Sequence, residues 1–180
     1  MSTEKTIESQ RLYEGRIINL RLDTIELPDG RTAKREIVEH RGAVAIVAID
    51  ENDNVLLVRQ FRTPVGGVLL EVPAGTLDPG EKPEDCARRE LQEETGFAAG
   101  HIERLGGFYS APGFCTEYLY LYLATELTPS RLEADYDENI EVEKVPLSEV
   151  HHLITSEKIR DAKSVGGLLL TLFSRSGKPT

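Results

Sequence analysis

The sequence has little of what marks disulfide-stabilised, membrane-spanning or nucleic-acid-binding proteins. Its two cysteines, Cys86 and Cys115, fit neither a disulfide framework nor a zinc-ligand spacing. The longest unbroken apolar run, residues 43–49, is far shorter than the roughly 20 residues that a membrane-spanning helix needs. Lys and Arg number 21 against 31 Asp and Glu, and no basic run offers a footprint for DNA or RNA. We therefore expect no membrane segment and no nucleic-acid partner.

The start of the chain also lacks a targeting pattern. Residues 1–5 are polar and do not form the apolar core of a signal peptide, so we expect a cytoplasmic protein. The chain has 180 residues, of which 39% are hydrophobic and 29% are charged. This length and composition predict one globular domain with its own core and a small terminal extension.

Strand-like runs alternate with turn signals over the first forty residues. The clearest strands are residues 17–27 and 32–40, separated by the turn sequence Pro-Asp-Gly at 28–30. We expect an antiparallel β extension over residues 1–40, followed by the main domain over residues 41–180. Exposed strand edges in such an extension favour pairing with a second copy of the chain.

The main domain mixes strand and helix patterns. Strands are predicted at 43–50, 55–62, 69–73, 102–109, 118–126 and 140–145, and helices at 83–95, 147–155 and 161–174. The first helix has the best-defined ends, because Pro83 suits a first helical position and Gly96 suits a left-handed residue after the last turn. A sheet with flanking helices predicts an α/β fold.

Three acidic residues of this first helix lie on one face. At about 100° per residue, Glu93 and Glu94 fall within about 60° of Glu90. The small residues Cys86 and Ala87 continue the same stripe, so the acidic face is expected to lie against the sheet. The alternative is a solvated helix surface, which is the usual explanation of a charge cluster.

Carboxylates this close repel one another unless a cation is present. At an effective dielectric constant of about 20 and a separation of about 6 Å, the repulsion of one pair is about 3 kcal/mol. Arg89 approaches the acidic face, but one guanidinium cannot neutralise three charges. Mg2+ characteristically binds one or two carboxylates together with substrate phosphates, so the pattern favours a magnesium site.

The same segment resembles the signature of the Nudix hydrolases. Every specified position of that signature is filled at the required spacing, by Gly75, Glu81, Arg89, Glu90, Leu91, Glu93, Glu94, Gly96 and Phe97. Residues 58–62, 70–75 and 110–114 are similar to the ADP-ribose pyrophosphatase branch, and Pro112 lies sixteen residues beyond Gly96, as is typical of that branch.

The resemblance implies a Nudix-type α/β/α sandwich with a mixed sheet. It also implies Mg2+-dependent hydrolysis of ADP-ribose to AMP and ribose 5-phosphate, with Mn2+ as a possible substitute. Another nucleoside diphosphate sugar or a dinucleoside polyphosphate remains an alternative substrate, and a non-catalytic nucleotide-sugar sensor is a third interpretation. Members of the branch exchange N-terminal strands between subunits, which implies a homodimer.

The resemblance also implies roles for single residues. The backbone carbonyl of Ala74 and the side chains of Glu90 and Glu94 would bind metal, with Glu93 as a further ligand or a supporting acid. Arg89 would assist catalysis by pairing with Glu81 to fix the loop and the carboxylates, and Gly75 and Gly96 would be structural. The general base would be Glu138, with Glu141 and Glu93 as competitors.

A further set of residues is expected to contact the substrate. Arg35 and Glu36 would reach the nucleoside end by resemblance, and Pro112 and Phe114 would shape the pocket for the terminal ribose. Arg59 and Arg62 could bring positive charge to the phosphates, although a surface salt bridge explains either arginine equally well.

Overall fold

The computed structural model describes residues 3–132 and 139–176. The chain forms two compact units. The first, here called the N-terminal unit, consists of residues 1–42 and 108–118, and the second, the main unit, consists of residues 43–107 and 119–180. Each unit is described below by itself.

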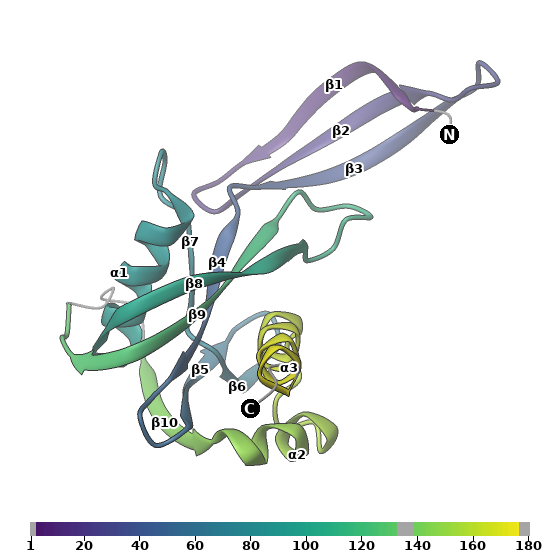
Figure 1. The fold of residues 1–180 in the computed structure, drawn as a ribbon. Helices are drawn as coiled ribbons and strands as arrows, with labels where there is room; N and C mark the ends of the chain where they lie inside the picture. The colour runs from purple at the N-terminus through teal and green to yellow at the C-terminus, as the bar shows by residue number, and fades with distance from the viewer. Residues whose placement is uncertain (1–2, 133–138, 177–180) are drawn as a thin grey trace. The chain divides into compact units, whose positions relative to one another are not determined.

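A three-stranded antiparallel sheet forms the N-terminal unit, in the order β1-β2-β3. Its strands are β1 (Lys5–Glu14), β2 (Ile18–Glu26) and β3 (Thr32–His40) (Figure 1). The last two match the predicted strands, and the turn between them lies at the predicted Pro-Asp-Gly. The segment 108–118 joins this unit at β3, where the Val38 N–H donates to the carbonyl of Phe114 over 2.8 Å.

The main unit is built on a seven-stranded mixed sheet with the central order β10-β5-β4-β9-β8. Its strands are β4 (Ala43–Ile49), β5 (Asn54–Arg62), β6 (Gly67–Glu71), β7 (Ala74–Thr76), β8 (Phe97–Tyr109), β9 (Tyr118–Pro129) and β10 (Ile140–Pro146). Strand β4 runs parallel to β9 and antiparallel to both β5 and β7. Because β4 meets β5 only at Ala48 and Ile49, the other half of that edge is open to β7.

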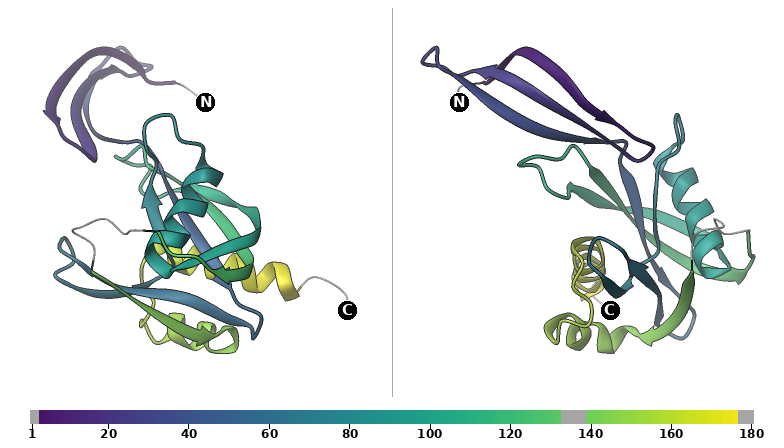
Figure 2. Two further views of the ribbon diagram at one scale, coloured as in Figure 1. Left: turned by 90° about the vertical axis from the view of Figure 1, so that its left-hand side faces the viewer. Right: turned by 180° about the vertical axis from the view of Figure 1, so that it is seen from behind.

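Helices cover both faces of this sheet. They are α1 (Pro83–Thr95), α2 (Val150–Thr155) and α3 (Ala162–Ser176), and a 3-10 turn, η1 (Leu147–Glu149), precedes α2. Figures 1 and 2 show α1 and α3 on opposite faces of the sheet around β4. The predicted α/β class is confirmed, and α1 has the predicted bounds. No helix in the described part of the chain is both long and apolar enough to cross a membrane.

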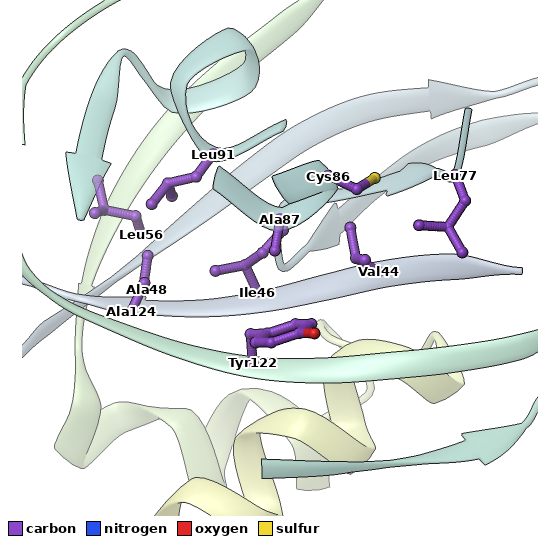
Figure 3. Close-up of a cluster of buried hydrophobic side chains, with 10 residues drawn as sticks. All are labelled: Val44, Ile46, Ala48, Leu56, Leu77, Cys86, Ala87, Leu91, Tyr122 and Ala124. Carbon is purple, nitrogen blue, oxygen red and sulfur yellow. The ribbon is translucent and has the colours of Figure 1, made fainter. Parts of the chain in front are cut away.

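The core lies where α1 packs on β4. Every residue of β4 is buried, as expected for a central strand covered on both faces. Figure 3 shows Ala87 of α1 lying over Ile46 of β4, with Cys86 nearer to Val44 and Leu91 nearer to Leu56 in the same buried cluster. On the opposite face a Cβ at Gly167 of α3 would lie 3.1 Å from Val47 Cγ2, so a glycine there lets the helix approach the strand closely.

Candidate active site

The connection between β6 and β7 leads the chain to Ala74 and Gly75, whose backbone contacts α1. After Glu71 the chain leaves β6, and the Val72 N–H donates to the buried Ser164 hydroxyl over 2.8 Å. The next carbonyl, that of Pro73, accepts from the Ile46 N–H over 2.8 Å. The sequence predicts a strand at 69–73 and a loop after it. It does not predict the short strand β7, because three residues centred on a glycine carry no periodic signal.

The carboxylate of Glu90 lies directly against the backbone of Gly75. A Cβ built on Gly75 would stand 1.9 Å from Glu90 Cδ and from Oε1, which no real side chain could do. Glycine is therefore required at this position by contact, since any side chain would displace the carboxylate. Glu90 is only 8% exposed, which agrees with the expectation that this helix face lies against the sheet.

The carboxylate of Glu94 meets the same crossing one helical turn later. Its Oε2 accepts a hydrogen bond from the Ala74 N–H over 3.0 Å, and the residue is 4% exposed. The spacing of four residues along α1 therefore places Glu90 and Glu94 beside two consecutive residues, Gly75 and Ala74. Both carboxylates face the sheet, and the solvated-surface alternative does not describe them.

Arg89 lies at the centre of an acidic cluster formed by Glu81, Glu90, Glu93 and Glu94. Its Nε and Nη2 donate to the two oxygens of Glu81 over 2.9 and 3.0 Å, which is the predicted pairing. Its Nη1 donates to Glu90 Oε1 over 2.7 Å and to Glu93 Oε2 over 2.8 Å. One guanidinium thus orients three carboxylates. The helical angles alone do not predict that one arginine binds all three. Four carboxylates against one guanidinium leave the cluster strongly negative.

The charges of this cluster shift the pKa values of its members. Hydrogen bonds from Arg89 are the largest cause that lowers the pKa of Glu81, to about 2, and they keep its carboxylate ionised. The hydrogen bonds to Glu81 and the neighbouring charge of Glu90 raise the pKa of Arg89 further above its usual range. The ion pair between the loop and α1 is therefore charged on both sides at neutral pH.

Cys86 is a contact of the site that sequence reasoning does not identify. Its Sγ accepts from Arg89 Nη2 over 3.4 Å and faces the carbonyl of Thr76 at 3.7 Å. Burial is the largest cause that raises the pKa of the thiol, with the charges of Glu90 and Glu81 adding to it, so Cys86 stays protonated and is no nucleophile. The signal is present in the helix spacing, because Cys86 precedes Arg89 by three residues.

The donors at this site fit a hard divalent cation. In the described part of the chain no three His, Cys, Asp or Glu side chains form a complete metal-binding group. The two buried carboxylates of Glu90 and Glu94 meet the backbone at Gly75 and Ala74 respectively, and carboxylate and carbonyl oxygens are the donors that Mg2+ prefers. Water or phosphate oxygens would have to complete the coordination, which is the usual mode for this ion.

The two candidate phosphate-binding arginines differ in their surroundings. Arg59 pairs with Glu143 on β10 over 2.6 Å, and both side chains are more than a third exposed, as in an ordinary surface salt bridge. Arg62 instead donates twice to one oxygen of Glu71, which is 2% exposed. Of the two, only Arg62 is held by a buried partner.

The remaining predicted substrate-binding residues and general bases do not lie on the elements that form the acidic cluster. Arg35, which pairs with Glu4, and the exposed Glu36 lie in the N-terminal unit. Pro112 and Phe114 are exposed in the 108–118 segment of the same unit. Glu141 is exposed on β10 opposite Arg59, and Glu138 lies outside the described residues.

Fold and site together define a mixed α/β domain in which an acidic helix and a glycine loop bring together donors that fit a divalent cation. Residues 39–165 match the family described as NUDIX domain, and residues 4–38 match the nucleoside diphosphate sugar hydrolase N-terminal domain. The chain is 42% identical over 163 residues to an ADP-ribose pyrophosphatase of Bacillus subtilis, covering 89% of this chain and 88% of the relative. It is 41% identical over 164 residues to a methanol dehydrogenase activator of Bacillus methanolicus, covering 90% and 89%.

A solved structure extends the likeness to three dimensions. The crystal structure of an ADP compounds hydrolase superposes with a TM-score of 0.89 at 25% identity, covering 98% of this chain and 96% of the other. The chain belongs to the Nudix family of hydrolases. The predicted family and fold are thereby confirmed, as is the similarity to the ADP-ribose pyrophosphatase branch. Nudix hydrolases in general use a divalent metal, and the donors described above fit one.

Proposed function

We propose that this protein hydrolyses the diphosphate linkage of ADP-ribose, with Mg2+, to AMP and ribose 5-phosphate. The observation that carries the proposal is the pair of buried carboxylates, Glu90 and Glu94, held against the backbone at Gly75 and Ala74. The ADP-ribose pyrophosphatase of Bacillus subtilis, 42% identical over nearly the whole chain, supports the choice of substrate. Water is the second reactant, and its oxygen ends on one of the two phosphate products.

The carbonyl of Ala74 and the carboxylates of Glu90 and Glu94 would hold the metal, with Glu93 as a further ligand. When bound, Mg2+ would neutralise the diphosphate oxygens and lower the pKa of a bound water, and we expect Mn2+ to substitute for it. Arg89 acts by orientation, since it already fixes Glu81, Glu90 and Glu93 through four hydrogen bonds. Its guanidinium therefore supports the chemistry without having to touch the substrate.

The remaining roles concern contacts with the substrate. Arg62, and less directly Arg59, would meet the diphosphate. Arg35 and Glu36 would contact the nucleoside end, while Pro112 and Phe114 would bound the terminal ribose. These assignments stay predictions, because the residues concerned belong to different parts of the chain from the acidic cluster.

Glu138 is the first candidate for the general base, and Glu141 and Glu93 are its competitors. A well-placed general base contributes roughly 10²–10⁴ in rate. Replacing each glutamate in turn with glutamine ranks the three, because only the base should lower kcat by that factor with little change in metal affinity. Glu93 differs from the others in its hydrogen bond to Arg89, so its replacement should also weaken the cluster.

The test of the proposal is the turnover of ADP-ribose by the purified protein with and without Mg2+. AMP and ribose 5-phosphate should appear only with the metal, and Glu90→Gln and Glu94→Gln should each lower the rate by at least about a hundredfold, because each removes a ligand charge. Glu84→Gln on the exposed side of the same helix is the matched control and should keep the rate. Unaltered rates in both site variants would refute the proposal.

Two alternatives are separated by the same assay. A panel of nucleoside diphosphate sugars and dinucleoside polyphosphates would reveal a different preferred substrate, which the N-terminal match to nucleoside diphosphate sugar hydrolases makes worth testing. The relative named as a methanol dehydrogenase activator favours a second interpretation, in which the protein acts on another protein as a nucleotide-sugar sensor. Tight nucleotide binding without turnover would support that interpretation.

We also propose that the protein is a cytoplasmic homodimer. Residues 1–40 would be its dimerisation extension and residues 41–180 its hydrolase domain. Every residue of β1 is exposed, and an exposed edge strand of ten residues invites pairing with another chain.

A further inference from the structure

A buried carboxylate next to the active site holds two cations from different elements. Glu71, the last residue of β6, is 2% exposed. Its Oε2 accepts from Nε and Nη2 of Arg62 over 2.8 and 2.6 Å. Its Oε1 faces Nζ of Lys163 at 2.9 Å. A buried carboxylate needs partners for both oxygens, and here each oxygen has its own cation.

Lys163 is fixed in this position by the first turn of α3. Its Nζ also lies 2.9 Å from Asp161 Oδ1, and the same oxygen accepts from the Ser164 N–H over 3.1 Å, which caps the start of the helix. The Ser164 hydroxyl in turn accepts from the Val72 N–H. The start of α3 thus anchors both the Glu71 side chain and the backbone that leads to Ala74 and Gly75.

The arrangement leaves one nitrogen of Arg62 without a contact to Glu71. Two of its three guanidinium nitrogens are turned to one oxygen of Glu71, and Nη1 has no hydrogen bond to any of the described residues. Because Lys163 occupies Oε1 of Glu71 and is itself balanced by Asp161, Glu71 engages Arg62 through Oε2 alone. About a third of its side chain is exposed, so an anion can reach it. A guanidinium held in this way is suited to a diphosphate oxygen, since it is already oriented before the ligand arrives.

We infer that Lys163 is a positioning residue for substrate binding, which acts through Glu71 to hold Arg62 ready for the diphosphate. The inference rests on the proposed function only for the identity of the substrate. Without the lysine, Oε1 of Glu71 loses its donor, and the carboxylate takes both terminal nitrogens of Arg62 as a bidentate partner. The guanidinium would then be held by Glu71 on both terminal nitrogens and withdrawn from the substrate.

The experiment is a double-mutant cycle on KM and kcat for ADP-ribose with Mg2+, using Lys163→Met, Arg62→Met and the double variant. Lys163→Met should raise KM about tenfold and leave kcat within about twofold, which corresponds to about 1.4 kcal/mol of lost binding. In the Arg62→Met background the same change should have almost no effect on KM, because the lysine acts only through the arginine. Lys163→Arg should restore most of the affinity.

Two controls distinguish positioning from general stability. Lys158→Met removes the same charge from an exposed site and should leave KM unchanged. The melting temperature of each variant measures how much stability is lost with the Lys163–Glu71 ion pair. If Lys163→Met does not fold, Lys163→Gln takes its place. A merely structural lysine would lower the melting temperature equally in both backgrounds and would leave KM unchanged or raise it additively with Arg62→Met. Either result overturns the inference, as does a loss confined to kcat.

Failure of the proposed function is recognised separately, because the wild-type protein would then not hydrolyse ADP-ribose at all. In that case the same cycle is run by calorimetry with magnesium pyrophosphate, which presents the diphosphate alone. A tenfold weaker Kd in Lys163→Met, absent in the Arg62→Met background, supports the inference independently of the substrate. Equal Kd values in all four proteins would contradict it.

Discussion

At Gly75 the chemistry depends on a missing side chain. The Glu90 carboxylate occupies the space that a Cβ would take, with a clearance of 1.9 Å to Oε1. Gly75→Ala should therefore push the Glu90 carboxylate away from the backbone at residue 75 and weaken Mg2+ binding and turnover by about a hundredfold or more, since the hydrolysis needs the ligand in place. Isothermal calorimetry with Mg2+ and an initial-rate assay would measure both quantities.

Gly67→Ala provides the matched comparison for this prediction. A Cβ at Gly67, which lies at the start of β6, would meet nothing within 4 Å, so the same methyl group should leave both metal affinity and rate unchanged. Normal Mg2+ affinity in Gly75→Ala would mean that Glu90 is not a ligand.

Single residues are predictable from the sequence to different degrees. The burial of Glu90 follows from the spacing of the helix face on which it lies, and the Glu81–Arg89 pair follows from the resemblance to the Nudix signature. The Glu71–Lys163 pair joins residues 92 positions apart through two separate elements, and no local pattern indicates it. Interactions of this kind depend on how elements pack, so only the structure shows them.

At the scale of elements, the Glu81–Arg89 ion pair fastens the glycine loop to α1, and its strength should vary with pH. The folded-state pKa of Glu81 is lowered from 4.5 to about 2, chiefly by hydrogen bonds from Arg89. A lowered pKa means that the stabilisation is fully present above about pH 4.5 and is lost as the pH falls toward 2. The linked free energy is about 3 kcal/mol.

Urea unfolding at several pH values from neutral down to about 2.5 would measure this contribution. Glu81→Gln should be less stable than the wild type at neutral pH, and the difference should shrink as the pH falls through the window from 4.5 to about 2. Glu84→Gln, whose carboxylate forms an exposed pair with Arg88 on the same helix, should follow the wild-type curve closely. A constant difference between Glu81→Gln and the wild type at all pH values would contradict the assignment.

The elements themselves are predicted best where local signals coincide. Helix α1 has both a proline at its start and a left-handed glycine, Gly96, after its end, and its predicted bounds are the observed ones. Strand β8 begins at Phe97, five residues before the predicted start, because alanine and glycine at its beginning carry no strand signal. The helix predicted at 147–155 begins as a 3-10 turn, a distinction that hydrophobic periodicity does not make.

At the scale of the whole molecule, the N-terminal sheet has an exposed apolar edge that no other part of the described chain covers. A three-stranded sheet needs a packed hydrophobic face to be stable by itself. The outer strand β1 instead exposes large apolar side chains, with Ile7 at 51%, Leu12 at 48% and Tyr13 at 57%. Natural proteins shorten, charge or cover such edges. A second copy of the chain would cover this one, in agreement with the predicted homodimer.

Sedimentation equilibrium at micromolar concentration should therefore give a mass of twice 20.0 kDa. Leu12→Asp places a charge on the exposed edge strand and should shift the equilibrium toward the single chain, because burying an unpaired carboxylate in an interface is costly. Val65→Asp, which alters an equally exposed apolar residue in the turn after β5, should leave the mass unchanged. A wild-type mass of one chain, or equal dissociation by both variants, would show that β1 is not the dimer contact. The covering of its apolar residues would then have to come from a different partner.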